Sequence, residues 1–257
     1  MIVSGLQTAI VWEEPRANFS VARTMANRAV MDGARLIALP EMFATGFSMD
    51  SEKVAAFADE TRSFLSGLAM DLGVIVLGGY AEPGEPLPFN ACSIYSETGE
   101  ELLHYRKIHP FTLAGEQDHY SGGDRIETAE IDGVRVTPVI CYDLRFPELF
   151  RAAAERTDLF VVVANWPAKR SDAWSTLLRA RAMENQAYVL GVNRVGTGAG
   201  EPHSGDSALF EPFGHPLAEA TGVPAIVTGE VDPEAVRSAR DHFSFLGDRR
   251  PEIYDQL

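Results

Sequence analysis

Short apolar runs alternate with longer amphipathic stretches along almost the whole chain of 257 residues, and this alternation limits the choice of fold more than any other feature. The run 159–164 (LFVVVA) has the length and the β-branched composition of a buried strand. The stretch 15–32 instead repeats apolar residues at helical spacing, and a glycine follows it. Strands and helices in alternation, with hairpin turns in the middle of the chain, predict a layered α/β fold.

The expected elements cover most of the sequence. Helices are predicted at 15–32, 54–72, 147–155, 172–187 and 233–240. Strands are predicted at 2–9, 36–39, 74–77, 89–95, 101–105, 125–131, 134–140, 158–163, 188–195, 207–210 and 225–231. The segments 97–100 and 132–133 have the composition of hairpin turns, and the glycine-rich segment 196–202 is expected to be a loop. Repeats and linkers are absent from the sequence, so residues 1–257 are expected to form a single domain.

Acidic residues outnumber basic ones by 37 to 22, which gives a formal net charge of −15. Attraction to nucleic acid or to anionic lipid is therefore not expected. An anionic small-molecule substrate would need a local cation in its pocket. Since no apolar run approaches the roughly 18 to 20 residues that span a bilayer, and the start lacks the basic segment of a signal peptide, we expect a cytoplasmic protein.

The chain has two cysteines, Cys92 and Cys141, and six scattered histidines. A protein of this size in a reducing compartment needs no disulfide framework. The sequence contains no CxxC or HExxH spacing, so neither a metal nor another cofactor is expected.

Cys141 follows the predicted strand 134–140 and precedes a helix start at 146–148, where Pro147 suits the first turn. Backbone N–H groups and the positive end of a helix dipole at such a turn would favour a thiolate. A buried structural thiol fits the same position. Cys92 lies inside a predicted strand and lacks this setting, so we interpret it as a core residue.

Two further reactive side chains also follow predicted strands. Glu41 lies just beyond 36–39, and Lys107 lies just beyond 101–105. Most glutamates and lysines are solvated surface groups. These two are set among proline and aromatic residues, and open α/β sheets place their sites at strand ends.

Seven blocks of the sequence resemble the nitrilase-like carbon–nitrogen hydrolases, and they occur in that family's order. The blocks are 39–41 (LPE), 105–109 (YRKIH), 141–148 (CYDLRFPE), 164–167 (ANWP), 179–188 (RARAMENQAY), 205–207 (GDS) and 212–214 (PFG). The resemblance implies a four-layer αββα sandwich, a homodimer, no cofactor, and a catalytic triad of Glu41, Lys107 and Cys141. It also implies that Glu116 is the family's second glutamate, which steadies the lysine; without the resemblance Glu116 would be interpreted as an exposed loop acid.

Within that family the segments 40–49 (PEMFATGFSM) and 141–146 (CYDLRF) resemble the ω-amidase branch, which hydrolyses the terminal amide of 2-oxoglutaramate and 2-oxosuccinamate. In that mechanism Cys141 attacks the amide carbon, Glu41 moves the protons, and Lys107 holds the oxyanion together with the backbone N–H of Tyr142. Arg145, four residues after the cysteine, could bind a substrate carboxylate, or it could pair with a neighbouring acid. Four aromatic residues are candidate pocket walls, although each could equally be core: Phe43, Phe47, Tyr142 and Trp166.

Several other functions fit parts of the sequence. The same three residues also serve N-carbamoyl hydrolases, other aliphatic amidases and nitrilases within the family. A Cys–His hydrolase using His109 or His119 would leave Glu41 and Lys107 without a role. A serine hydrolase lacks its GxSxG elbow, since 203–207 (HSGDS) has the wrong spacing. A nucleotide-binding module would rest on the glycines of 196–200, with no helix after them. A catalytically silent binding protein of the same fold is the last possibility.

Overall fold

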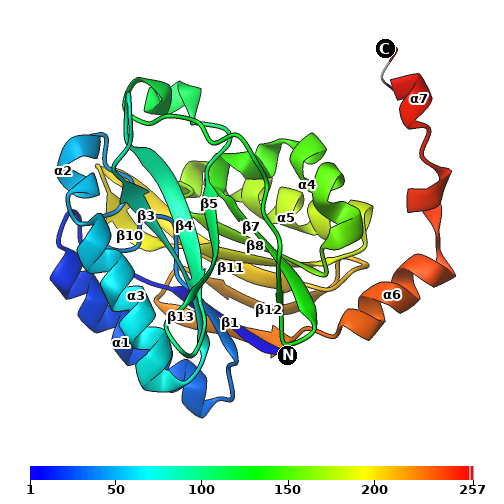
Figure 1. Ribbon diagram of the computed structural model, residues 1–257, viewed down its shortest axis with the longest axis horizontal. Helices are drawn as coiled ribbons and strands as arrows, with labels where there is room; N and C mark the ends of the chain where they lie inside the picture. The colour runs from blue at the N-terminus through cyan, green and yellow to red at the C-terminus, as the bar shows by residue number, and fades with distance from the viewer. Residues whose placement is uncertain (255, 257) are drawn as a thin grey trace.

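Two β-sheets packed face to face form the centre of the protein, and helices cover both outer faces (Figure 1). The computed structural model describes residues 1–254 and 256. No helix of this part of the chain is both long enough and apolar enough to cross a membrane.

The first sheet has six strands in the order β13-β1-β2-β3-β4-β5. The strands β1, β2 and β3 are parallel, and the other neighbours are antiparallel. Their bounds are β1 Ile2–Gln7, β2 Leu36–Ala38, β3 Ile75–Glu82, β4 Phe89–Tyr95, β5 Glu101–Arg106 and β13 Ala225–Glu230.

The second sheet runs in the order β10-β11-β9-β8-β7-β6, and β12 pairs with β11 beside it. Its centre, β7-β8-β9, is parallel. The bounds are β6 Ala129–Ile131, β7 Val134–Ile140, β8 Leu159–Ala164, β9 Tyr188–Asn193, β10 Val195–Gly198, β11 Glu201–Phe210 and β12 Pro216–Thr221.

The helices divide between the two outer faces and a C-terminal segment. The α-helices are α1 Pro15–Met31, α2 Ser51–Ala55, α3 Ala58–Leu72, α4 Pro147–Ala153, α5 Ser171–Asn185, α6 Pro233–His242 and α7 Pro251–Tyr254. Short 3-10 turns are η1 Thr112–Ala114, η2 Glu116–Asp118, η3 Cys141–Arg145, η4 Ala154–Arg156, η5 Ala168–Arg170 and η6 Phe245–Asp248. Helix α6 packs on the layers through the buried residue Val236, and beyond α6 the chain extends away from them, so that α7 lies apart (Figure 1).

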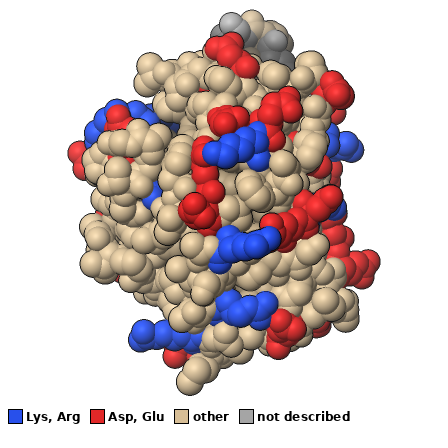
Figure 2. Space-filling model, turned by 90° about the vertical axis from the view of Figure 1, so that its left-hand side faces the viewer, with Lys and Arg blue, Asp and Glu red and all other residues tan. Residues whose placement is uncertain are grey.

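Three apolar clusters fix the order of the layers. One joins the inner faces of both sheets and contains Leu77 and Val161. A second packs α1 and α3 on the first sheet, and a third packs α4 and α5 on the second. The layers therefore run helix, sheet, sheet, helix, which confirms the expected αββα sandwich. Acidic and basic side chains interleave on the face of the molecule that Figure 2 shows. Two ion pairs, Arg16–Glu60 and Arg23–Asp71, join α1 to α3 on the outside of the first helical layer.

Local sequence explains many of the element ends. At the end of α3 the chain reverses through Gly73 with φ +64°, and the N–H of Val74 donates to the Ala69 carbonyl at 3.2 Å. The hairpin between β6 and β7 turns through Asp132 and Gly133, both at positive φ. Hence the strand 134–140 begins at its predicted residue.

Some expectations were wrong. The segment 196–202 is not a loop, because most of it belongs to the two strands of the β10–β11 hairpin, and β11 begins at Glu201 rather than at 207. The helix expected at 54–72 is two helices, α2 and α3, which meet at Ala56 and Phe57. The strand expected at 125–131 is shorter, and β12 was not predicted at all.

Candidate active site

The three reactive side chains follow the ends of three strands and lie together at the same site. Glu41 follows β2, Lys107 follows β5, and Cys141 follows β7 as the first residue of η3. Cys141 has φ +48°, a left-handed conformation that costs a non-glycine residue about 1–3 kcal/mol. The surrounding structure thus holds the cysteine at a sharp turn between a strand and a helical segment.

Lys107 lies between two carboxylates in the interior. Its Nζ is 3.1 Å from Glu41 Oε1 and 2.8 Å from Glu116 Oε2, and all three side chains are at most 1% exposed. The interpretation of Glu116 as an exposed loop acid is therefore wrong. The buried Glu116 carboxylate has polar partners, because besides Lys107 it accepts a hydrogen bond from the Phe111 N–H at 2.5 Å.

Two asparagines that the sequence did not single out orient Glu41. Asn90 Nδ2 donates to Glu41 Oε1 at 2.7 Å and to Glu116 Oε1 at 3.0 Å, so one amide bridges both carboxylates. The backbone N–H of Asn165 donates to Glu41 Oε2 at 2.7 Å. Each oxygen of Glu41 is therefore held, which fixes the direction of its carboxylate plane.

The charges of this cluster keep the lysine charged and the cysteine neutral. Burial alone would lower the pKa of Lys107, but Glu116 and Glu41 outweigh it and raise that pKa above its ordinary value. Burial, and after it the charge of Glu41, raises the pKa of Cys141 well above its ordinary value, although Lys107 opposes the shift. Burial of the thiol and the charge of Glu41 thus oppose the tendency towards a thiolate that backbone N–H groups would give at this turn.

Asp143 connects the cysteine turn to the lysine segment. It is fully buried and accepts from the Tyr105 hydroxyl at 2.7 Å and from the backbone N–H of His109 at 3.0 Å. It also accepts from the backbone N–H of Ile140 at 3.1 Å. Since Tyr105 and His109 flank Lys107 in sequence, these bonds fix the spacing between lysine and cysteine.

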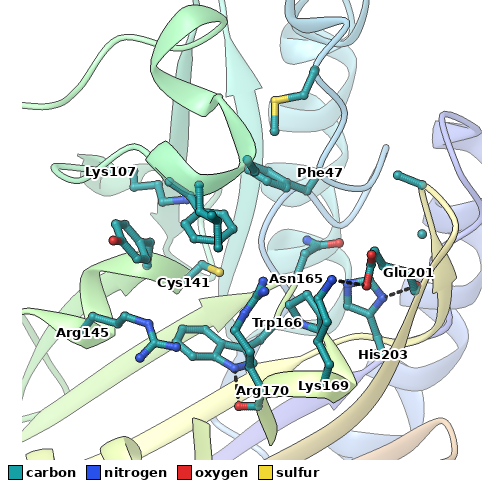
Figure 3. Close-up of a pocket in the computed structure, with 18 of the residues that line it drawn as sticks. Phe47, Lys107, Cys141, Arg145, Asn165, Trp166, Lys169, Arg170, Glu201 and His203 are labelled. Carbon is teal, nitrogen blue, oxygen red and sulfur yellow. Dashed lines mark hydrogen bonds and ion pairs between the residues drawn. The ribbon is translucent and has the colours of Figure 1, made fainter. Parts of the chain in front are cut away.

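A cavity of about 490 Å³ opens in front of the cysteine (Figure 3). Cys141 and Lys107 line its inner end, together with Asn165, Tyr142 and Arg145. The segments η1 and η5 and the β10–β11 hairpin supply its outer walls. A half-buried thiol beside a buried ammonium and a directed carboxylate, facing a cavity of this size, can support nucleophilic attack on a small molecule.

The family model described as carbon-nitrogen hydrolase matches residues 3–241. The chain belongs to the carbon-nitrogen hydrolase family. It is 36% identical over 240 residues to the omega-amidase YafV of Escherichia coli K12, covering 93% of this chain and 92% of that protein. It is 32% identical to the 2-oxoglutaramate amidase of Bacillus subtilis, covering 98% of both chains.

Solved structures agree with this assignment. The carbon-nitrogen hydrolase superfamily protein XC1258 of Xanthomonas campestris superposes with a TM-score of 0.91 at 32% identity, covering 97% of each chain, and carries an arsenic adduct in its active site. The protein described here is thus an enzyme, a cysteine-dependent carbon–nitrogen hydrolase.

Most of the predicted substrate-binding residues of this carbon–nitrogen hydrolase face the cavity. Phe47, Tyr142 and Trp166 line it, and the guanidinium of Arg145 lies over the Trp166 ring at 4.9 Å from its centroid. Within the part of the chain that the structure describes, Arg145 makes no ion pair; the neighbouring acid Asp143 instead accepts hydrogen bonds from other groups. The guanidinium of Arg145 is therefore available to a substrate carboxylate. Phe43 does not line the cavity and is core. It packs 6.0 Å from the Phe19 and Phe64 rings, between the first sheet and its helices.

The alternative of a Cys–His hydrolase, which would use His109 or His119, finds no support in the positions of these two histidines. His109 Nδ1 lies 2.8 Å from Asp143, and the ring stacks on Phe146, while neither His109 nor His119 lines the cavity. The histidine that does line it is His203, which the sequence did not single out. Burial and, after it, the charge of Arg194 lower the pKa of His203 to about 4, so it is a neutral wall group near pH 7.

A nucleotide-binding role for the glycine-rich segment finds no geometric support. The segment 196–200 consists of the end of strand β10 and the hairpin turn into strand β11, with no helix after it to receive a phosphate. In residues 1–254 and 256, no three His, Cys, Asp or Glu side chains are grouped so as to hold a metal ion.

Proposed function

We propose that the enzyme hydrolyses the terminal amide of a small dicarboxylic acid monoamide, of the 2-oxoglutaramate or 2-oxosuccinamate type, to the acid and ammonia. The observation that carries the proposal is the guanidinium of Arg145, which has no ion-pair partner among the described residues, lies on the same turn as Cys141 and faces the same cavity. In a chain of net charge −15 this cation gives a substrate carboxylate a specific partner. The names of the E. coli and B. subtilis relatives support the same substrate class.

The first step is acylation of Cys141. Because the pKa of the thiol is raised, the sulfur needs a base, and the carboxylate of Glu41 takes its proton as the sulfur attacks the amide carbon. The tetrahedral intermediate then collapses. Glu41 returns the proton to the departing nitrogen, ammonia leaves, and a thioester joins the acyl group to the sulfur.

The negative oxygen of the tetrahedral state is proposed to lie between the Lys107 ammonium and the backbone N–H of Tyr142. Fixed donors of this kind contribute about 3–4 kcal/mol each to transition-state stabilisation. Lys107 suits the task because its raised pKa keeps it charged throughout the cycle. Glu116 holds Lys107 in place from the side and is a positioning residue.

Hydrolysis of the thioester repeats the sequence with water. Glu41 takes a proton from the attacking water, the oxygen adds to the thioester carbon, and the bond to sulfur breaks. The proton held by Glu41 passes to the sulfur, which restores the thiol and the free acid. Three side chains therefore suffice for both halves of the reaction.

The test is ammonia release from 2-oxoglutaramate and 2-oxosuccinamate, beside glutamine, a carbamoyl amino acid and a simple nitrile. We expect the two oxo-acid amides to have the highest kcat/KM. Preference for the carbamoyl compound or the nitrile would move the enzyme to another branch of its family. A mass increase on Cys141 with a slow amide, absent from the Cys141→Ala protein, would exclude a silent binding protein.

We further propose that the chain forms one domain and works as a homodimer in the cytoplasm. Both cysteines are free, which suits a reducing compartment. Phe243 and Tyr254, at 62% and 54% exposed, lie on the C-terminal segment that extends from the layers (Figure 1), where a second copy could cover them. Light scattering that gives a mass of about 28 kDa, the mass of one chain, would refute the dimer.

A further inference from the structure

The outer end of the cavity carries two cations to which the reaction above gives no role. They are Lys169 and Arg170 of η5, and both line the cavity (Figure 3). The Lys169 side chain is 56% exposed, whereas Lys107 at the inner end is 1% exposed. The cavity therefore presents positive charge at its mouth as well as beside the nucleophile.

Arg170 is held in place without an acidic partner. Its guanidinium lies over the Phe111 ring, 5.1 Å from the centroid, and its backbone carbonyl accepts a hydrogen bond from Trp166 Nε1 at 2.8 Å. No carboxylate of the described residues pairs with it. An arginine stacked on an aromatic ring keeps its planar N–H edge free for an anion.

Lys169 is paired, but weakly. Its Nζ lies 2.8 Å from Glu201 at the start of β11, and both side chains are about half exposed. Solvent-exposed ion pairs of this kind contribute little to stability, so a ligand anion can compete with Glu201 for the ammonium. Figure 3 shows Lys169 and Glu201 joined in this way beside His203.

The cavity is also larger than a four- or five-carbon monoamide requires. Pockets of about 300–1,000 Å³ enclose drug-sized ligands, and this one measures about 490 Å³. A short substrate would reach from Cys141 to Arg145 on the same turn. The space beyond has apolar walls, which are Trp12, Met49, Phe111, Leu113 and Pro167.

We propose that Arg170, assisted by Lys169, is an outer anion subsite that extends the activity to ω-monoamides of longer dicarboxylic acids, with six to eight carbons. The amide lies at Cys141, the methylene chain lies against the apolar walls, and the distal carboxylate binds the free edge of Arg170. This inference rests on the proposed function, because the chemistry at Cys141 is the same.

The test compares kcat/KM for suberamate, the eight-carbon monoamide, with that for octanamide, which has the same chain but no carboxylate. In the wild-type enzyme we expect the carboxylate to improve kcat/KM by about ten- to a hundredfold, the value of a charge-assisted hydrogen bond. Arg170→Met should abolish this preference, Arg170→Lys should retain part of it, and Lys169→Met should reduce it by a smaller factor. Activity on octanamide reports in each variant that the active site is folded.

Arg179→Met is the matched control, because Arg179 is an exposed residue of the following helix α5 and does not line the cavity. It should leave the preference unchanged. If Arg170→Met keeps the wild-type preference, or the wild-type enzyme does not hydrolyse suberamate while it hydrolyses succinamate, the outer subsite is refuted and the proposed function stands. If no monoamide of any length is hydrolysed, the proposed function itself fails.

Discussion

Replacing Lys107 by methionine tests how far its positive charge stabilises the two buried carboxylates of Glu41 and Glu116. The substitution keeps much of the side-chain volume but removes the ammonium that lies between Glu41 and Glu116. Both carboxylates already share the amide of Asn90, so they lie too close together to ionise independently. We expect one of them to bind a proton at neutral pH.

The magnitude follows from the ordinary pKa of 4.5 for a glutamate. Holding one such carboxyl protonated at pH 7 costs about 3 kcal/mol, since each pH unit is about 1.4 kcal/mol. This agrees with the 3–5 kcal/mol lost when one partner of a buried pair is removed. At pH 5 the same protonation costs less than about 1 kcal/mol. The destabilisation should therefore shrink by about 2–3 kcal/mol as the pH falls from 7 to 5.

The wild-type lysine does not contribute to this pH dependence. Its pKa is raised above 10.5, so its stabilising contribution is complete below that pH and is lost only as the pH rises through the higher folded-state pKa. The window between pH 5 and pH 7 thus reports on the carboxyls alone.

The measurement is urea denaturation of the wild-type and Lys107→Met proteins at pH 5, 6 and 7. Lys53→Met is the control, because Lys53 is half exposed and pairs with Glu13 on the surface. Its free energy of unfolding should fall far less than that of Lys107→Met, because exposed ion pairs contribute little to stability. If Lys107→Met destabilises the protein equally at pH 5 and pH 7, the idea that Glu41 or Glu116 takes up a proton in this variant is refuted.

Three further outcomes are expected. Iodoacetamide should alkylate Cys141 slowly near neutrality, with a rate that still rises above pH 9, because the pKa of the thiol is raised; a plateau below pH 8 would contradict this. Arg145→Lys should raise KM at least tenfold for carboxylate-bearing amides but not for neutral ones, as steady-state assays with both would reveal. Asp143→Asn should lower the free energy of unfolding, measured in urea, by about 1–3 kcal/mol, because it weakens the hydrogen bonds from Tyr105 and His109. Since these bonds fix the distance between the Lys107 segment and the Cys141 turn, the substitution should also lower kcat more than it raises KM. An unchanged kcat would remove Asp143 from that role.

The convergence of Glu41, Lys107 and Cys141 could be anticipated because each follows a predicted strand. The apolar pattern and the turn residues placed those strands well, and the turn at Asp132 and Gly133 marks the start of β7. Glu116 could be anticipated only from the family resemblance, since a loop glutamate carries no local sign that it will be buried.

Other features depend on tertiary contacts that no local pattern encodes. β12, with the sequence PLAEAT, has little apolar character and becomes a strand by pairing with β11. Asn90 and Asn165 look like ordinary polar residues until Glu41 is placed beside them. Phe43 and Phe47 are four residues apart in one segment, yet only the second faces the cavity.

The outer walls of the cavity come from η1, η5 and the β10–β11 turn, whereas the reacting groups are anchored at the ends of core strands. Insertions or substitutions in these three connections can change which acyl chain fits without moving sulfur, carboxylate or ammonium. Mutational libraries confined to 112–114, 168–170 and 198–201 are consequently a direct route to altered selectivity with the reaction itself preserved.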